Sequence, residues 1–272
     1  MTAATSAEVA GWAVEAAGSG PPLVLLHGFT GAGVSWTDHV EMFEKGFRVI
    51  VPDLPGHGRS THVDPAHMSV ERTADDLAGI LERLHAFPAA ILGYSMGARI
   101  ALRLAVAHPA AVSRLVLESP SPGFADPVAR AERRAADAEL ADDLERDGIA
   151  DFVARWERQP MFAGQALTPE TAERQRRIRL ANDPQSLAAS LRAAGQGSME
   201  PLHDRLPGLA APTLVIAGRA DAVGRQRAEL VAAAIPGARL SLIDGAGHTP
   251  HLEQPARFQR IVLAFLQEDL AA

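Results

Sequence analysis

The segment Gly93-Tyr94-Ser95-Met96-Gly97 has the pattern G-x-S-x-G, in which a serine is held on a sharp turn between a strand and a helix. An apolar run, Ala89 to Gly93, precedes this serine, and a helical pattern from Ala98 to Ala107 follows it. Glycines are required beside the turn because side chains there would meet neighbouring backbone. We therefore predict that Ser95 is catalytic and that its hydroxyl stands above the edge of a sheet.

A serine hydroxyl reacts only when a base accepts its proton. His248 is the predicted base because it follows the last apolar run of the chain, in the loop Asp244-Gly245-Ala246-Gly247-His248. The other histidines are less suitably placed, and His251 is expected to pack beside His248 or to orient it.

The base in turn needs an acid that orients its ring and stabilises its protonated form. Asp221 is the predicted acid, because it follows the apolar run Thr213 to Ile216 and keeps the chain order serine, acid, histidine. Glu118, directly after the run Leu115 to Leu117, is the alternative. Asp244 is interpreted as a turn residue.

Charge that develops on a substrate oxygen needs two backbone N–H donors. The residue after the serine, Met96, is expected to supply one of them. Phe29, in the glycine-containing loop that follows the first apolar run, is expected to supply the other.

These residues need a scaffold of strands alternating with helices, and the sequence predicts one. Buried strands are predicted at Leu23 to Leu26, Arg48 to Val51, Ala89 to Gly93, Leu115 to Leu117, Thr213 to Ile216 and Arg239 to Ile243. Helical patterns separate them, and a last helix is predicted from Pro255 to Leu270. The predicted class is α/β, namely an α/β-hydrolase fold with a mostly parallel sheet flanked by helices.

Residues 124–206 interrupt this alternation. They are charged, rich in arginine and helical in period, with Pro169 and Pro184 each at a possible first turn. We predict an inserted helical lid at 124–206, and a hydrolase core formed by 1–123 and 207–272.

Composition excludes several classes of function. The net charge of −7 argues against a nucleic-acid surface, and the absence of cysteine excludes disulfides and thiolate sites. No signal peptide and no apolar stretch of membrane-spanning length is recognisable, so a cytoplasmic protein without membrane insertion is expected. The sequence implies no metal and no organic cofactor, and it does not indicate an oligomeric state.

Arg99 distinguishes this chain from a simple ester hydrolase. It lies four residues after Ser95, one turn into the helix, where a cation would stand beneath the floor of the site. A neutral ester does not need such a cation, whereas an anionic substrate does. A salt bridge to a buried acid is the alternative interpretation.

At this point the sequence resembles the 2-succinyl-6-hydroxy-2,4-cyclohexadiene-1-carboxylate synthase family of menaquinone biosynthesis. The resemblance runs from about Leu23 to Phe265 and is most specific in a few segments. These are Gly93 to Arg99, Glu118-Ser119-Pro120-Ser121-Pro122-Gly123, Glu132-Arg133-Arg134 with Asp137, Phe152-Val153-Ala154-Arg155-Trp156, Gln159-Pro160-Met161-Phe162, and Arg179 with Asn182.

The resemblance implies a lyase that eliminates pyruvate from 2-succinyl-5-enolpyruvyl-6-hydroxy-3-cyclohexene-1-carboxylate, a small substrate with three carboxylates. It implies that Arg99, Arg133 and Arg179 bind these carboxylates, and that Tyr94 and Trp156 line the pocket. Arginine suits that role because its planar fork matches a carboxylate.

Two departures and two alternatives accompany this prediction. Ala98 stands where the family usually has glycine, and Ala222-Val223-Gly224 lacks the Lys-Phe pair expected near the acid. The first alternative is a carboxylic ester or lactone hydrolase that forms an acyl-Ser95 intermediate. The second is a non-catalytic ligand-binding protein on the same scaffold.

Overall fold

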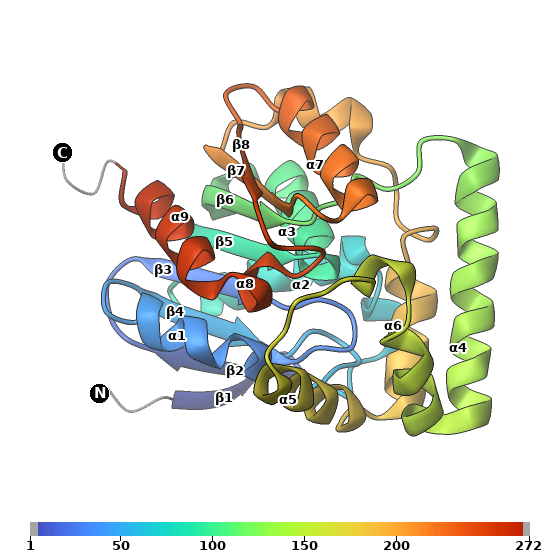
Figure 1. The fold of residues 1–272 in the computed structure, drawn as a ribbon. Helices are drawn as coiled ribbons and strands as arrows, with labels where there is room; N and C mark the ends of the chain where they lie inside the picture. Colours follow the sequence, from blue (N-terminus) through green and yellow to red (C-terminus); the bar gives the residue numbers. More distant parts are fainter. Residues whose placement is uncertain (1–4, 269–272) are drawn as a thin grey trace.

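The structure is a computed structural model that describes residues 5–268, and within them eight strands form one sheet (Figure 1). The strands are β1 (Thr5–Val9), β2 (Trp12–Ala17), β3 (Pro22–Leu26), β4 (Arg48–Pro52), β5 (Ala89–Tyr94), β6 (Val112–Glu118), β7 (Thr213–Gly218) and β8 (Arg239–Ile243). Their order is β1-β2-β4-β3-β5-β6-β7-β8. β2 is antiparallel to both of its neighbours, and every other pair is parallel. The prediction of a mostly parallel α/β sheet is confirmed.

Helices cover both faces of this sheet. The described helices are α1 (Thr37–Phe43), α2 (Val70–Arg83), α3 (Met96–Ala107), α4 (Pro127–Trp156), α5 (Pro169–Leu180), α6 (Pro184–Ala194), α7 (Ala222–Ala234), α8 (Pro250–Glu253) and α9 (Pro255–Gln267). Short 3-10 turns lie at η1 (Gly33–Trp36), η2 (Pro65–His67), η3 (Pro109–Ala111), η4 (Pro160–Phe162) and η5 (His203–Gly208). Helices α1 and α9 pack on one face, and α2, α3 and α7 pack on the other.

Strand β3 shows why the short apolar runs predicted strands correctly. Alternate side chains of a strand point to opposite faces. Leu23 and Leu25 accordingly join the core under α1 and α9, while Val24 and Leu26 join the core under α2, α3 and α7. A strand that is buried on both faces is apolar at every position, so it appears in the sequence as an uninterrupted run.

The two N-terminal strands were not predicted. In β2, Trp12 and Val14 are buried, whereas Ala13 and Glu15 between them are partly or fully exposed. This alternation is typical of an antiparallel strand near the edge of a sheet, and it leaves no continuous apolar run to find. The last helix, predicted to end at Leu270, ends at Gln267; Leu270 itself lies outside the described residues.

The segment after β6 is helical, and helices α4 and α6 stand side by side at the right of Figure 1. The helices α4, α5 and α6 each begin with a proline at the first turn, after a side chain that accepts a backbone N–H: Asp126, Thr168 and Asp183. Gly148 interrupts α4 with a non-helical φ of 80°. The helices share their own apolar core, which includes Phe152, Trp156 and Leu187. The exact boundaries at 124 and 206 stay a prediction.

Asp53, directly after β4, forms hydrogen bonds with two neighbouring loops. Its carboxylate accepts the backbone N–H of Gly33 at 2.6 Å and both the N–H and the Nε–H of Arg59, at 3.0 and 2.9 Å. Burial alone would raise the pKa of Asp53, but these hydrogen bonds lower it overall. Asp53 is therefore charged in the folded protein at neutral pH.

We expect Asp53→Ala to lower the free energy of unfolding by about 1–3 kcal/mol, because the buried Gly33 N–H loses its acceptor. Since the folded-state pKa is lowered, this contribution is complete above the unfolded pKa and is lost as the pH falls through the folded value. Urea unfolding at pH 7 and in steps below pH 4 measures both effects. Asp38→Ala, which removes an exposed partner of Arg174, should cost less than about 1 kcal/mol. Equal losses for the two variants would contradict this assignment.

Candidate active site

Ser95 lies between β5 and α3 with φ of 52° and ψ of −105°, a conformation that side-chain-bearing residues rarely adopt. The chain tolerates it because two glycines leave room. A Cβ on Gly93 would lie 2.3 Å from the carbonyl oxygen of Gly97, and a Cβ on Gly97 would lie 2.3 Å from that of Leu26. The turn therefore lifts the Ser95 side chain off the edge of the sheet.

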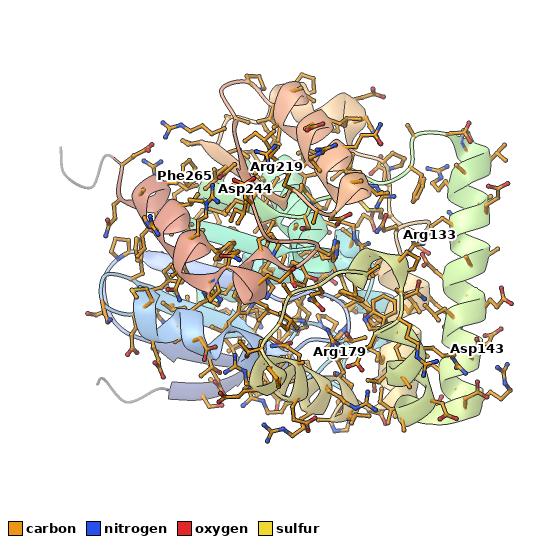
Figure 2. All side chains as sticks on the ribbon, viewed as in Figure 1. Arg133, Asp143, Arg179, Arg219, Asp244 and Phe265 are labelled. Carbon is orange, nitrogen blue, oxygen red and sulfur yellow. The ribbon has the colours of Figure 1, made fainter. Side chains whose placement is uncertain are left out.

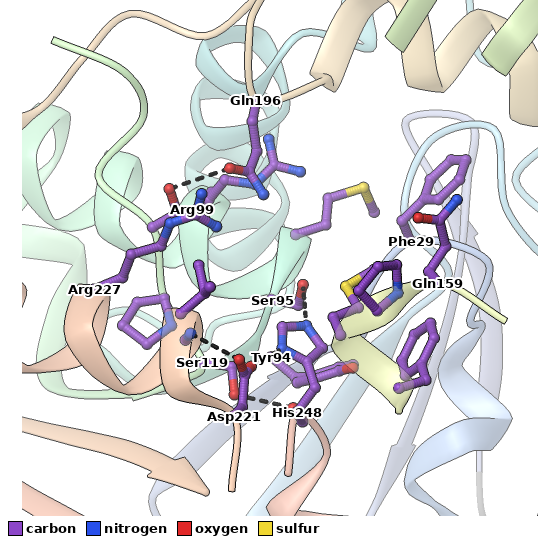
Figure 3. A pocket seen from close by; sticks show the side chains of 18 of the residues that line it. Phe29, Tyr94, Ser95, Arg99, Ser119, Gln159, Gln196, Asp221, Arg227 and His248 are labelled. Atoms are coloured by element: carbon purple, nitrogen blue, oxygen red, sulfur yellow. Dashed lines mark hydrogen bonds and ion pairs between the residues drawn. The ribbon is translucent and has the colours of Figure 1, made fainter. Parts of the chain in front are cut away.

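The structure brings Ser95, His248 and Asp221 together (Figure 3). Ser95 Oγ lies 3.3 Å from His248 Nε2, and His248 Nδ1 lies 2.7 Å from Asp221 Oδ2. Burial alone would raise the pKa of Asp221, but hydrogen bonds from His248 and from the Gly224 N–H lower it overall. An ionised Asp221 accepts the Nδ1 proton, which leaves Nε2 free to accept the Ser95 proton.

Gly224 belongs to the segment near the acid in which this chain departs from the family. Its N–H donates to Asp221 Oδ1 at 2.8 Å, and a Cβ on Gly224 would lie 2.2 Å from Asp221 Oδ2. A larger residue at this position would displace the carboxylate that His248 needs.

A buried carboxylate, Glu253 in α8, holds the loop that carries His248. Glu253 accepts the backbone N–H groups on both sides of the imidazole, from Gly247 at 2.9 Å and from Thr249 at 3.0 Å. Its Oε2 also accepts the N–H of Ala166 at 3.1 Å, in the segment that joins α4 to α5. The base loop and the helical insertion thus share one acceptor.

The alternative acids have other partners. Glu118 is fully buried, and its Oε1 accepts both the N–H and the Nδ1–H of His251 at 2.9 Å. Asp244 lies at the surface, where it forms an ion pair with Arg219 at 2.5 Å (Figure 2). Neither contacts the ring of His248, so Asp221 is the acid in place to orient the predicted base.

Ser95 opens into a cavity of about 740 Å³ between the sheet and the helical insertion. The predicted backbone donors, Phe29 and Met96, both line it. Met96 is the first residue of α3, where an N–H group has no partner within the helix. The Phe29 ring packs edge-on against Trp156 at a centroid distance of 5.2 Å. This contact involves only the side chain, so the donor role of the Phe29 N–H stays a prediction.

Tyr94 and Trp156 also line this cavity. Tyr94 fits beneath Ser95 because Gly28 has no side chain; a Cβ there would lie 2.6 Å from the tyrosine ring. The ring of Tyr94 contacts that of His248 at 5.6 Å between centroids, and burial raises the pKa of Tyr94 well above its ordinary value. Tyr94 is therefore a neutral wall of the cavity.

Arg99 is a buried cation at the edge of the cavity, with 6% of its surface exposed. Its Nη1 donates to the carbonyl oxygen of Ala194 at 2.5 Å. No carboxylate among the described residues forms an ion pair with Arg99, so the salt bridge considered from the sequence is absent there. Burial lowers the pKa of Arg99 to about 10, which still leaves it protonated at neutral pH.

The other two predicted arginines differ in position (Figure 2). Arg133, in α4, lines the Ser95 cavity and forms an ion pair with Asp137 at 2.7 Å. Arg179, in α5, lines a neighbouring cavity of about 30 Å³ instead. Its charge is paired with Glu157 at 3.0 Å, and its guanidinium lies 5.6 Å from the Phe162 ring.

Sequence reasoning missed other polar residues of the cavity. Ser119 Oγ donates to the carbonyl oxygen of His248 at 2.9 Å, and it belongs to the segment that carries the family resemblance. Gln159, Gln196 and Arg227 also line the cavity, as Figure 3 shows. For Arg227 the available signal was its helical spacing of four residues from Val223, just after the acid.

Among the described residues, no cluster of histidine and carboxylate side chains could hold a metal ion. None of the described helices is long and apolar enough to cross a membrane.

Fold and site together define an α/β-hydrolase-type serine site, and comparison with known proteins agrees. The model of the alpha/beta hydrolase fold family matches residues 21–255. A Bacillus subtilis protein provisionally named 2-succinyl-6-hydroxy-2,4-cyclohexadiene-1-carboxylate synthase is 39% identical, over 90% of this chain and 89% of its own. A Salmonella paratyphi C protein with this synthase name is 34% identical, over 87% and 90%.

Two solved structures extend the comparison. The structure of MenH from S. aureus is 35% identical, with a TM-score of 0.90, over 96% of this chain and 99% of that one. A thermophilic esterase from Thermogutta terrifontis, solved with malate bound, is 28% identical, with a TM-score of 0.82, over 98% and 99%. The chain therefore belongs to the α/β-hydrolase family and, within it, to the family of the 2-succinyl-6-hydroxy-2,4-cyclohexadiene-1-carboxylate synthases.

We expect Gly97→Ala to lower the free energy of unfolding by about 1–3 kcal/mol or more, because the new methyl group would overlap the carbonyl of Leu26. Gly46→Ala is the matched control, since a Cβ there meets nothing within 4 Å. Thermal unfolding of both variants measures the difference. A Gly97→Ala protein as stable as the control would contradict the packing described for the turn.

Proposed function

We propose that this chain eliminates pyruvate from 2-succinyl-5-enolpyruvyl-6-hydroxy-3-cyclohexene-1-carboxylate to give 2-succinyl-6-hydroxy-2,4-cyclohexadiene-1-carboxylate. The observation that carries the proposal is the composition of one cavity. It contains a serine within reach of an oriented imidazole, and also a buried arginine, Arg99, that has no carboxylate partner among the described residues. The names of the relatives support the same activity. A cytoplasmic location remains part of the prediction.

The proposed reaction begins with a proton transfer. Ser95 Oγ passes its proton to His248 Nε2 and removes a proton from the ring carbon beside the succinyl ketone. The electron pair of that C–H bond forms an enolate, whose oxygen faces the N–H groups of Phe29 and Met96. General-base catalysis of this kind contributes about 10²–10⁴-fold in rate.

The bond to the leaving group then breaks. The enolate electrons shift through the ring double bond and expel the enolpyruvyl oxygen, so that two conjugated double bonds remain in the ring. The proton taken from the ring carbon restores the Ser95 hydroxyl. The proton held on His248 passes to the methylene carbon of the departing enolpyruvate, which becomes pyruvate. No bond between Ser95 and the substrate is required.

Binding of the substrate depends on charge. Arg99 and Arg133 supply cations at the cavity, and Tyr94 and Trp156 supply flat apolar walls against which a six-membered ring can lie. Charge-assisted hydrogen bonds from arginine to carboxylate are among the strongest that side chains make. The sites of the three carboxylates would therefore fix the orientation of the ring above Ser95.

We expect Ser95→Ala, His248→Ala and Asp221→Asn each to lower kcat for pyruvate release by about 10²–10⁴-fold, because each breaks the path of the proton. Release is measured by coupling pyruvate to the oxidation of NADH by lactate dehydrogenase. Ser6→Ala, at an exposed position in β1, should leave kcat unchanged. A wild-type protein that hydrolyses simple esters with an acyl-enzyme burst but releases no pyruvate would support the hydrolase alternative instead.

We expect Arg99→Ala to raise KM for this substrate by about 10-fold or more, because the carboxylate loses a charge-assisted partner. Hydrolysis of a neutral ester such as p-nitrophenyl acetate, if detectable in the wild type, should change little. Arg103→Ala, one turn further along α3, where Arg103 pairs with Glu200 at the surface, is the control. A parallel loss of both activities would mean that Arg99 maintains the site and does not select the substrate.

A further inference from the structure

Arg227 is a third arginine of the Ser95 cavity. It lies in α7, the helix that begins directly after Asp221, and it lines the cavity together with Val223 and Gly224. A long side chain on a helix leans back over the turn that precedes it. Arg227 therefore extends over Gly224, which has no side chain to block it, towards the end of the helix that carries the acid. Figure 3 shows Arg227 and Arg99 on one side of Ser95, and Phe29 on the other.

The charge of Arg227 is not neutralised by a neighbour. No carboxylate among the described residues forms an ion pair with it; its guanidinium lies 5.7 Å from the ring of Phe124. Burial, followed by the positive charge of Arg133, lowers the pKa of Arg227, and the charge of Asp221 opposes that shift only in part. The folded protein therefore keeps the Arg227 guanidinium in a partly buried position that disfavours its positive charge.

The three arginines of the cavity form a like-charged cluster. Arg133 and Arg227 both lower the pKa of Arg99, and Asp137, the acid that raises it most, is already paired with Arg133. Three cations around one carboxylate repel one another, and this repulsion is relieved when an anion enters. The cluster is local, because the chain as a whole has a net charge of −7.

Arg179 lines the small neighbouring cavity, and it shares the carboxylate of Glu157 with Arg176. Its role at a substrate carboxylate stays a prediction. Arg227, by contrast, opens onto the cavity of Ser95 with its charge unpaired.

We infer that Arg227 forms a carboxylate subsite of the Ser95 cavity, and that with Arg99 and Arg133 it completes the binding of a tricarboxylate. The effect that we expect on KM rests on the proposed function, because KM is measured with the proposed substrate. The subsite itself is a matter of anion binding, and it can be tested without turnover.

The first test compares Arg227→Ala with Arg225→Ala. Arg225 lies in the same helix, outside the lining of the cavity, with its Nε 3.7 Å from Glu229 Oε1. We expect Arg227→Ala to raise KM for the tricarboxylate substrate by about 10-fold or more with less than about a threefold change in kcat, since it removes uniform binding. Arg225→Ala should change KM less than about twofold. Arg227→Lys should recover part of the loss, because it keeps the charge without the fork.

The second test measures binding of propane-1,2,3-tricarboxylate by titration calorimetry to the wild type and to both alanine variants. We expect Arg227→Ala to weaken this binding about 10-fold or more, and Arg225→Ala to leave it unchanged. Equal affinities of the two variants, or no binding to the wild type, would overturn the subsite. If no variant releases pyruvate but Arg227→Ala still loses the tricarboxylate, the subsite stands and the proposed reaction fails.

Discussion

The site depends on a single imidazole that must reach two side chains from distant parts of the chain. His248 follows β8, Asp221 follows β7, and Ser95 follows β5. Strands β5 to β8 are parallel neighbours in the sheet, so their carboxyl ends lie along one edge. The loops after them therefore meet, as ligand-binding loops of α/β sheets generally do. If the strands shifted in register, the distances of 3.3 and 2.7 Å that link the three side chains would be lost.

Local signals in the sequence were sufficient for most of the fold. The central strands are buried on both faces, so each is a short apolar run, and the helices of the insertion begin with a capping side chain and a proline. Strand β2, next to the edge strand β1, was missed because Trp12 and Val14 alternate with partly or fully exposed residues. Its place in the sheet is decided by pairing with β4, far along the chain, which no local pattern reveals.

The residues of the candidate site likewise divide into those that the sequence predicts and those that it does not. The glycines around Ser95 follow from backbone geometry, and the order of acid and histidine follows from the fold, so both could be predicted. Which arginine faces the cavity depends on how each helix is rotated against its neighbours. The spacing of charges along a helix gives its faces but does not say which face lies inward. For this reason the sequence did not single out Arg227, which lines the cavity without a carboxylate partner among the described residues, and it placed Arg179 at the Ser95 cavity, whereas Arg179 lines the neighbouring one.

The carboxylate of Glu253 connects the loop of the catalytic base to the helical insertion. It accepts N–H groups from the loop of His248 and also from Ala166, in the segment that links two helices of the insertion. A displacement of that segment would remove the Ala166 N–H from the carboxylate and change its hydrogen bonding with the loop of His248. The same carboxylate therefore borders both the covering helices and the loop of the proton acceptor, so a substitution at Glu253 changes the support of both.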